Sequence, residues 1–378
     1  LDYLAEVTMS ILRKQMRRDP LLGYAKDLVS LMRPLLPVMA ERGLRVVTNG
    51  GGVNPRSCAK AIIEEARRQG FTGVKIGIVT GDDILDNVDT LVGGGMLLKN
   101  METGRPVTDV RSQLQSANVY FGAAPIVEAL RRGADIVVTG RTTDTGLTLA
   151  PMIHEFGWAP DDWNKLAAGT VAGHILECGG QASGGNFLGD WRSVPDLEHI
   201  GFPIAEAFPD ARVVITKHAG TGGRVSAATV KEQLLYEIGD PRTYITPDCI
   251  ADFTTIHVSD EGLDRVRVDG VQGRPATDSY KVSMAYLDGY TAFGTLTYAW
   301  PDALEKARAA DRILRGRLQA AGLEFEEVRT ELLGHSSSHG HLSPTDRAPD
   351  EVVLRIGVRG QDSNAVERFG MALAPLIL

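Results

Sequence analysis

The chain has 378 residues, of which 43% are hydrophobic and 23% charged, so it is long enough for two or more globular domains with real cores. Its formal net charge is −8 and no run of Lys or Arg stands out, which argues against a nucleic-acid partner, because such binding depends on concentrated positive charge. No apolar run approaches the roughly 18 residues that a membrane-spanning helix needs, so we expect no membrane partner. Cys58, Cys178 and Cys249 are widely spaced and form no zinc-type pair, which favours a reducing cytoplasm.

The first part of the chain begins with two helical segments and then alternates between strands and helices. The helical segments cover residues 7–18 and 25–42, and residues 1–5 resemble the end of a strand. Short β-branched runs predict strands at 45–48, 75–79, 119–121, 136–138 and 213–215. Helices are expected at 55–69, 124–132, from about 145, at 165–178 and along the apolar stripe at 230–238, with a long loop or lid at 92–108. This alternation predicts a parallel sheet with right-handed crossovers.

The composition shifts near residue 239, and the second part has a different pattern. Asp269-Gly270 is typical of a hairpin turn, and further strands are expected at 281–287, 291–299, 324–333 and 351–358. Helices are expected at 303–321 and from 365 onward. We therefore predict an α/β domain over residues 1–239, with a mostly parallel open sheet and flanking helices, and a smaller α+β domain with an antiparallel sheet over residues 240–378.

Polar residues follow four of the predicted strands. Ligands of open parallel sheets bind beyond the carboxyl ends of the strands, so four neighbouring parallel strands would bring these loops to one cleft. That cleft would contain Asn49, Asp82, Asp83, Arg141, Asp144, Lys217, His218 and Arg224. Such a set suits an anionic substrate and proton transfer. The alternative is that Asp83 and Asp144 only cap the helices that follow them.

The turn at Lys217–Arg224 contains Gly220, Thr221, Gly222 and Gly223 between a predicted strand and a predicted helix. Glycines let backbone N–H groups approach a ligand, and a helix N-terminus favours negative charge, so the turn is a candidate anion cradle. It matches neither a P-loop, in which the lysine follows the last glycine, nor a dinucleotide fingerprint. A tight turn with exposed basic residues explains the same pattern.

No sequence signature of a metal site or a nucleophile is present. His174 and Glu177 share one face of a predicted helix beside Cys178, but a metal site needs three or four converging ligands. Such a pair is more often structural, and a lone cysteine usually packs as a small hydrophobe. We assign no metal-ligating residues, and no cofactor can be named.

Several blocks of the chain resemble the acyclic terpene utilisation family. They include Thr139-Gly140-Arg141-x-x-Asp144, Gly173-His174-x-Leu176-Glu177-Cys178, Gln181-Ala182-x-Gly184-Gly185-Asn186-Phe187 and Thr216-Lys217-His218-x-Gly220-Thr221-Gly222-Gly223-Arg224. The resemblance covers nearly the whole chain in order. It implies a bacterial cytoplasmic protein whose relatives often lie among genes for breaking down citronellol, geraniol or other branched acids as CoA thioesters. It also implies a strand before residue 1, so we expect a piece of a longer chain, with a further truncation at the apolar C-terminal end.

The first functional hypothesis is an enzyme that acts on an anionic intermediate, such as an acyl-CoA, by hydratase-like or lyase-like acid–base chemistry. Lys217, Arg224 and Arg141 would hold the anion together with Asn49, Asp144 and the turn residues Gly220, Thr221, Gly222 and Gly223. His218 or Asp82 would move protons, and Asn186 would orient the substrate. The alternative is a non-catalytic acyl-CoA-binding or scaffold subunit that works with a CoA carboxylase or ligase. A metal-dependent enzyme that uses Asp82, Asp144, His174 or His218 is a third possibility, and a homo-oligomer is a possible state of assembly.

Overall fold

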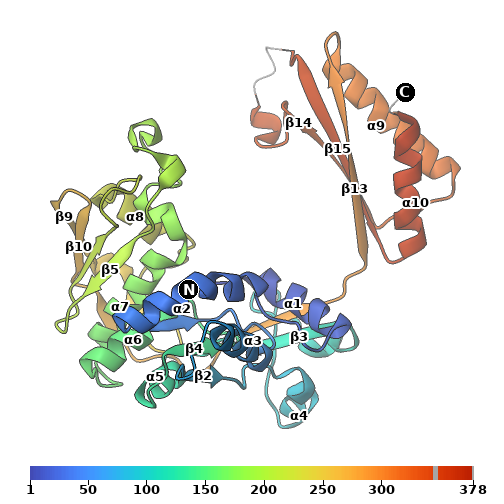
Figure 1. Ribbon diagram of the computed structural model, residues 1–378. Coiled ribbons are helices and arrows are strands. Elements are labelled where there is room, and N and C mark those ends of the chain that lie inside the picture. The colour runs from blue at the N-terminus through green and yellow to red at the C-terminus, as the bar shows by residue number, and fades with distance from the viewer. Residues whose placement is uncertain (344–347, 377–378) are drawn as a thin grey trace. The chain divides into compact units, whose positions relative to one another are not determined.

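The computed structural model describes residues 1–343 and 348–376, and the chain forms two compact units, Leu1–Tyr286 and Leu287–Leu378 (Figure 1). The stretch 240–286, which the sequence placed in the second domain, contributes strands to the first unit. Among the described residues, no helix has the length and apolar character needed to cross a membrane.

A three-stranded parallel sheet lies at the centre of the first unit. Its strands are β1 (Val46–Thr48), β4 (Ile136–Thr139) and β2 (Ile76–Val79), in the order β1-β4-β2. Side chains of a strand point alternately to its two faces. Ile136 and Val138 accordingly pack with α2 (Lys26–Arg42) and α3 (Pro55–Arg68) on one face. Val137 packs on the other face, with α5 (Ala124–Arg131), α6 (Gly146–Phe156) and α7 (Trp163–Glu177).

The start of the chain runs beside this sheet without forming a strand. The Leu1 nitrogen donates to the Val47 carbonyl at 2.7 Å, and the Tyr3 N–H donates to Asn49 Oδ1 at 2.7 Å. The predicted strand end at residues 1–5 is therefore wrong, because these bonds do not continue as a ladder. Helix α1 (Glu6–Arg18) follows.

The strand before the glycine-rich turn does not belong to the parallel sheet. Instead, β6 (Val213–Thr216) lies in an antiparallel sheet with the order β5-β6-β10-β9. Its partners are β5 (Ile204–Ala207), β10 (Arg265–Asp269) and β9 (His257–Gly262). The prediction of four parallel neighbours is thus wrong for β6, since a short β-branched run carries no information about the direction of its partner.

The remaining strands of the first unit also pair antiparallel. They form the pair β12 (Val282–Tyr286) with β3 (Leu114–Val119), and the sheet β11 (Gln272–Arg274), β8 (Ile250–Asp252), β7 (Tyr244–Ile245). The predicted hairpin turn at Asp269-Gly270 is wrong, because β10 and β11 lie in different sheets. The turn lies instead at Leu263-Asp264, between β9 and β10. Two more helices complete the unit, α4 (Val88–Gly93) and α8 (Ala227–Leu235).

The second unit has two helices on one face of an antiparallel sheet (Figure 1). The sheet order is β13-β15-β14, with bounds Tyr290–Ala299, Glu351–Gly360 and Glu327–Leu333. Apolar side chains of α9 (Ala303–Ala320) and α10 (Ser363–Leu373) meet the inward side chains of β15 in the core. The predicted antiparallel sheet and its two helices are confirmed.

Short 3-10 helices occur in both units, at Leu85–Asn87, Val107–Gln113, Gly179–Ser183, Trp191–Ser193, Leu197–His199, Phe253–Thr255, Gly340–Leu342 and Ala374–Leu376.

Candidate functional site

The carboxyl ends of the three parallel strands do bring predicted residues together. Asp82 follows β2, and its Oδ2 accepts hydrogen bonds from the Arg141 N–H after β4 and from Asn118 Nδ2, both at 2.9 Å. Burial raises the pKa of the Asp82 carboxyl, although the two hydrogen bonds oppose this shift. Asn49, after β1, is fully buried and donates to Asp2 Oδ1 at 2.6 Å. Asp82 and Asn49 thus fix the loops at this edge of the sheet.

Arg141 is the buried cation of the cluster, with only 1% of its surface exposed. Its guanidinium donates to Asp144 Oδ1 at 2.6 Å and to the Leu4 carbonyl, and it lies 4.2 Å from the centroid of the Tyr120 ring. An arginine fork can satisfy several acceptors at once, which explains its use here. Because Asp144 accepts from Arg141 and helix α6 has no side-chain cap, the capping alternative does not describe Asp144.

Asp83 has a different role from Asp82. Its carboxylate pairs with Arg13 of α1 and accepts from the Leu85 N–H at 3.1 Å. The first contact joins the loop to helix α1, and the second lies within the loop itself, and contacts of this kind hold loops in place. Asp83 therefore anchors the loop after β2 to α1.

Three carboxyl groups meet beside Arg141. Single oxygens of Asp2, Asp144 and Glu177 lie within 4.8 Å of one another, and in the described part of the chain no other such group could hold a metal ion. Carboxylate oxygens are suitable ligands for a hard divalent cation. Glu177 ends helix α7, and burial together with the charges of Asp144 and Asp2 raises its pKa to about 8. At neutral pH, Glu177 therefore carries a proton beside an arginine-paired aspartate.

His174, one turn before Glu177, is a buried link between elements. Its Nε2 lies 3.0 Å from the Gln233 carbonyl of α8, and its Nδ1 lies 3.5 Å from the Tyr244 hydroxyl. Gln233 Nε2 donates back to the His174 carbonyl at 2.8 Å. Burial lowers the pKa of His174, so the neutral ring is favoured. His174 thus holds α7 against α8 and β7 and fixes the helix end from which Glu177 projects.

The backbone donors of the glycine-rich turn are used inside the protein. The Gly222 N–H donates to the His199 carbonyl at 2.8 Å, the Gly223 N–H to Pro195 at 2.7 Å, and the Arg224 N–H to Ser183 at 2.8 Å. Buried backbone groups need such partners. An anion at this turn would have to compete with these hydrogen bonds.

The side chains of the turn also have local partners or face outward. Lys217 Nζ lies 3.1 Å from Asp264 Oδ2 and donates to the Thr221 carbonyl at 2.8 Å. Arg224 donates to Ser193, and His218 is exposed. Asn186 is also exposed and donates to Gln181 Oε1 at 3.2 Å. Within the described residues, no hydrogen bond or ion pair joins Lys217, His218, Arg224 or Asn186 to Asp82 or Arg141.

A substitution at Gly222 tests whether close packing requires a glycine in this turn. A Cβ at this position would lie 1.7 Å from the Asp196 carbonyl oxygen, which belongs to backbone and cannot swing aside. We expect Gly222→Ala to lower the free energy of unfolding by about 2 kcal/mol or more, measured by denaturant titration. Gly239→Ala is the matched control, because nothing lies within 4 Å of its added Cβ. Equal stability of the two variants would contradict this account of the turn.

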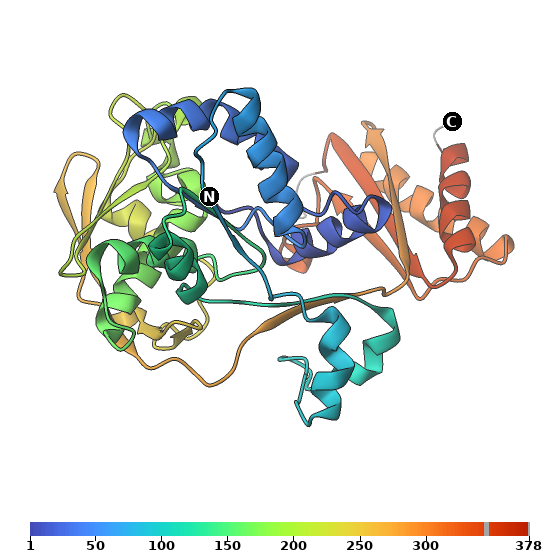
Figure 2. The same cartoon turned by 60° about the horizontal axis from the view of Figure 1, so that its bottom comes forward.

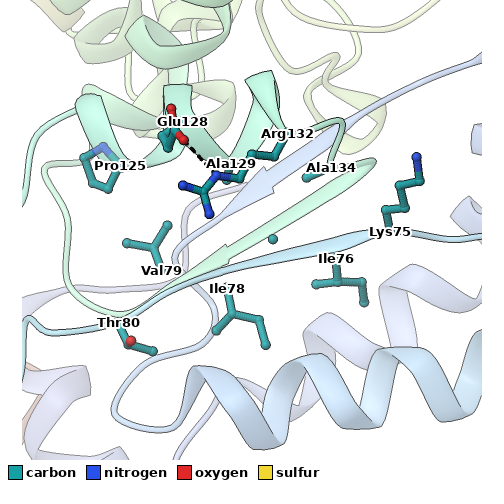
Figure 3. Close-up of a pocket in the computed structure, with 11 residues that line it drawn as sticks. Lys75, Ile76, Ile78, Val79, Thr80, Pro125, Glu128, Ala129, Arg132 and Ala134 are labelled. Carbon is teal, nitrogen blue, oxygen red and sulfur yellow. Dashed lines mark hydrogen bonds and ion pairs between the residues drawn. The ribbon is translucent and has the colours of Figure 1, made fainter.

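A hollow of about 460 Å³ runs along the outer edge of β2 and beneath α5 (Figure 3). Ile76, Ile78 and Val79 line it, and its charged groups include Glu128 and Arg132, which pair with each other at 2.7 Å. None of the predicted site residues lines this hollow. The chemistry-bearing groups are therefore at the strand ends, away from this strand edge.

Sequence reasoning did not identify Asp2, Asn118 and Tyr120, and it interpreted Glu177 as one half of a structural pair. The only local signal was the three-residue spacing of His174 and Glu177 on one helix face. Asp2, Asp144 and Glu177 are far apart in sequence, and only the fold brings them together.

Comparison with known proteins identifies the family. The model of the acyclic terpene utilisation family protein AtuA matches residues 1–378, so the chain belongs to this family. No curated protein and no solved structure gave a match.

Proposed function

We propose that this member of the acyclic terpene utilisation family is an enzyme of branched or isoprenoid acid catabolism, acting on an anionic substrate such as an acyl-CoA. The proposed chemistry is of the acid–base type found in hydratases and lyases. The observation that carries the proposal is the pair formed by Glu177, with its pKa raised to about 8, and Asp144, which pairs with Arg141. Neighbouring carboxyl groups in different environments, here one with a raised pKa and one paired with an arginine, are typical of an acid and a base that work together.

The roles follow from the charges. Glu177 would donate its proton to a carbon or to a leaving group, and Asp144, which is paired with Arg141, would accept a proton from water or substrate. In a hydration, Asp144 would take one proton from water while Glu177 gives one proton to the substrate, so the number of protons held by the two carboxyl groups does not change. Asp2 completes the carboxyl cluster, and Asn49 holds it through a 2.6 Å hydrogen bond.

Lys217 and Arg224 remain part of the proposal as contacts to the distal, anionic part of the substrate. His218, predicted to move protons, and Asn186, predicted to orient the substrate, are assigned to the same part of the substrate. They are a prediction from the sequence pattern and the family resemblance. The internal hydrogen bonds of the turn make direct chemistry there less favourable than at the carboxyl cluster.

The proposal can be tested by assaying turnover of geranyl- and citronellyl-derived CoA thioesters. We expect the purified protein to convert a thioester alone, with activity reduced at least about tenfold in His218→Ala and Arg224→Ala, because these residues would supply binding energy. Full activity in both variants would remove the turn from the substrate site. Binding without turnover, together with co-purification of a CoA carboxylase or ligase, would support the non-catalytic alternative.

A further inference from the structure

A second hollow, of about 520 Å³, lies in the first unit between β12 and residues 97–110. Figure 2 shows β12 running beside β3, near the segment that follows α4. This volume lies within the ~300–1,000 Å³ that is usual for small-molecule sites. None of Asp82, Asp144 or Glu177 lines it, so it is separate from the carboxyl cluster.

One wall of the hollow is apolar and rests on a small core. Val107 is buried, and Leu98, Val282 and Met284 pack against that core from the hollow side. The rim also exposes apolar side chains, since Leu97 is 77% and Met101 83% exposed. A group of exposed apolar side chains around a hollow marks a binding surface more often than a single exposed residue does.

Lys99 is the cation at this hollow that an anion can meet. Lys99 is exposed and has no ion pair among the described residues. Arg105 pairs with Asp109 at 3.2 Å, so these two charges compensate each other, and Glu102 is the remaining carboxylate of the lining. Lys281 is exposed, and its ammonium lies 4.8 Å from the centroid of the Tyr120 ring, so this lysine has contacts of its own. The lining thus combines an apolar wall with Lys99, a cation that forms no ion pair among the described residues.

We propose that this hollow binds a free aliphatic carboxylate of medium chain length. The chain lies along Leu97, Val282 and Met284, and the carboxylate meets Lys99. Burying exposed apolar surface drives the binding, and the lysine selects the anionic end. This site goes beyond the proposed function, because binding here requires neither Glu177 nor any reaction.

Isothermal titration calorimetry with decanoate tests the proposal. We expect saturable binding at one molecule per chain, with decanol and decylamine binding at least about fivefold more weakly because they lack the negative charge. Lys99→Gln should lower the affinity for decanoate about fivefold, and Leu97→Ser should lower it by a similar factor. Both side chains are exposed, so neither change should disturb folding.

Control substitutions of an exposed lysine and an exposed leucine outside the hollow show whether the effects on affinity are specific to it. Lys60→Gln removes another exposed lysine, and Leu263→Ser removes a leucine that is 91% exposed, and both should bind decanoate like the wild type. Glu177→Gln should also bind normally, which separates this site from the carboxyl cluster. Equal affinity for decanoate, decanol and decylamine, or unsaturable binding, would overturn the assignment. Wild-type affinity in Lys99→Gln and Leu97→Ser would do the same.

Discussion

Replacing Glu177 with Gln is expected to lower kcat about 10²- to 10⁴-fold, because glutamine keeps the shape of the protonated acid and cannot transfer its proton. In the wild type, the acid must be protonated to act, and burial with Asp144 and Asp2 raises its pKa to about 8. Activity should therefore hold below pH 8 and fall above it, and the limb of the pH–rate profile near pH 8 should be absent in the variant.

Stability gives a second readout that needs no substrate. The folded-state pKa of Glu177 lies above its ordinary value of 4.5, so the folded state favours the protonated form. Its contribution to stability is thus fully present below about pH 4.5 and is lost as the pH rises towards 8. We expect Glu177→Gln to gain stability relative to the wild type over this range, by on the order of 3 kcal/mol, in denaturant titrations at pH 5 and pH 8.5.

Glu155→Gln is the control for this experiment, because the Glu155 side chain is 61% exposed and its contacts with Arg45, at 2.9 Å, and with His154, at 4.0 Å, leave it at the surface. Its stability difference from the wild type should change little between pH 5 and pH 8.5. If Glu177→Gln behaved like Glu155→Gln in stability and in activity, the carboxyl cluster would have no role in proton transfer.

Arg141→Met is expected to lower the free energy of unfolding by about 3–5 kcal/mol, because it removes the cation from a buried pair. Only 1% of Arg141 is exposed, and its loss leaves Asp144 without its 2.6 Å partner and beside Asp2 and Glu177. The change also removes a positive charge that lowers the pKa of Glu177, so that pKa should rise further.

Arg45→Met provides the matched control for Arg141→Met. The Arg45–Glu155 pair spans 2.9 Å, but its side chains are 43% and 61% exposed, so its loss should cost less than about 1 kcal/mol. Combining Arg141→Met with Asp144→Asn should recover part of the stability, because the carboxylate that lost its Arg141 partner is removed as well. Additive losses in the double variant would argue against the ion pair as the cause.

The sequence alone determined much of the local structure. Pro55 after Asn54 predicted a helix start, and in the structure Asn54 accepts from the Ser57 N–H at 3.3 Å while Pro55 opens α3. The strand at 136–138 and the helices of the second unit were also predicted correctly. Periodicity and turn chemistry act over a few residues, so they can be seen without the fold.

Tertiary structure alone decided sheet membership and the carboxyl cluster. The run Val213–Val214–Ile215 predicts a strand equally well beside a parallel or an antiparallel partner, and only β5 and β10 fixed its place. The raised pKa of Glu177 depends on burial and on Asp144 and Asp2, which reach it from distant parts of the chain. A pKa shift depends on all the atoms and charges that surround the group in the folded protein, so the spacing of residues along the sequence does not reveal it.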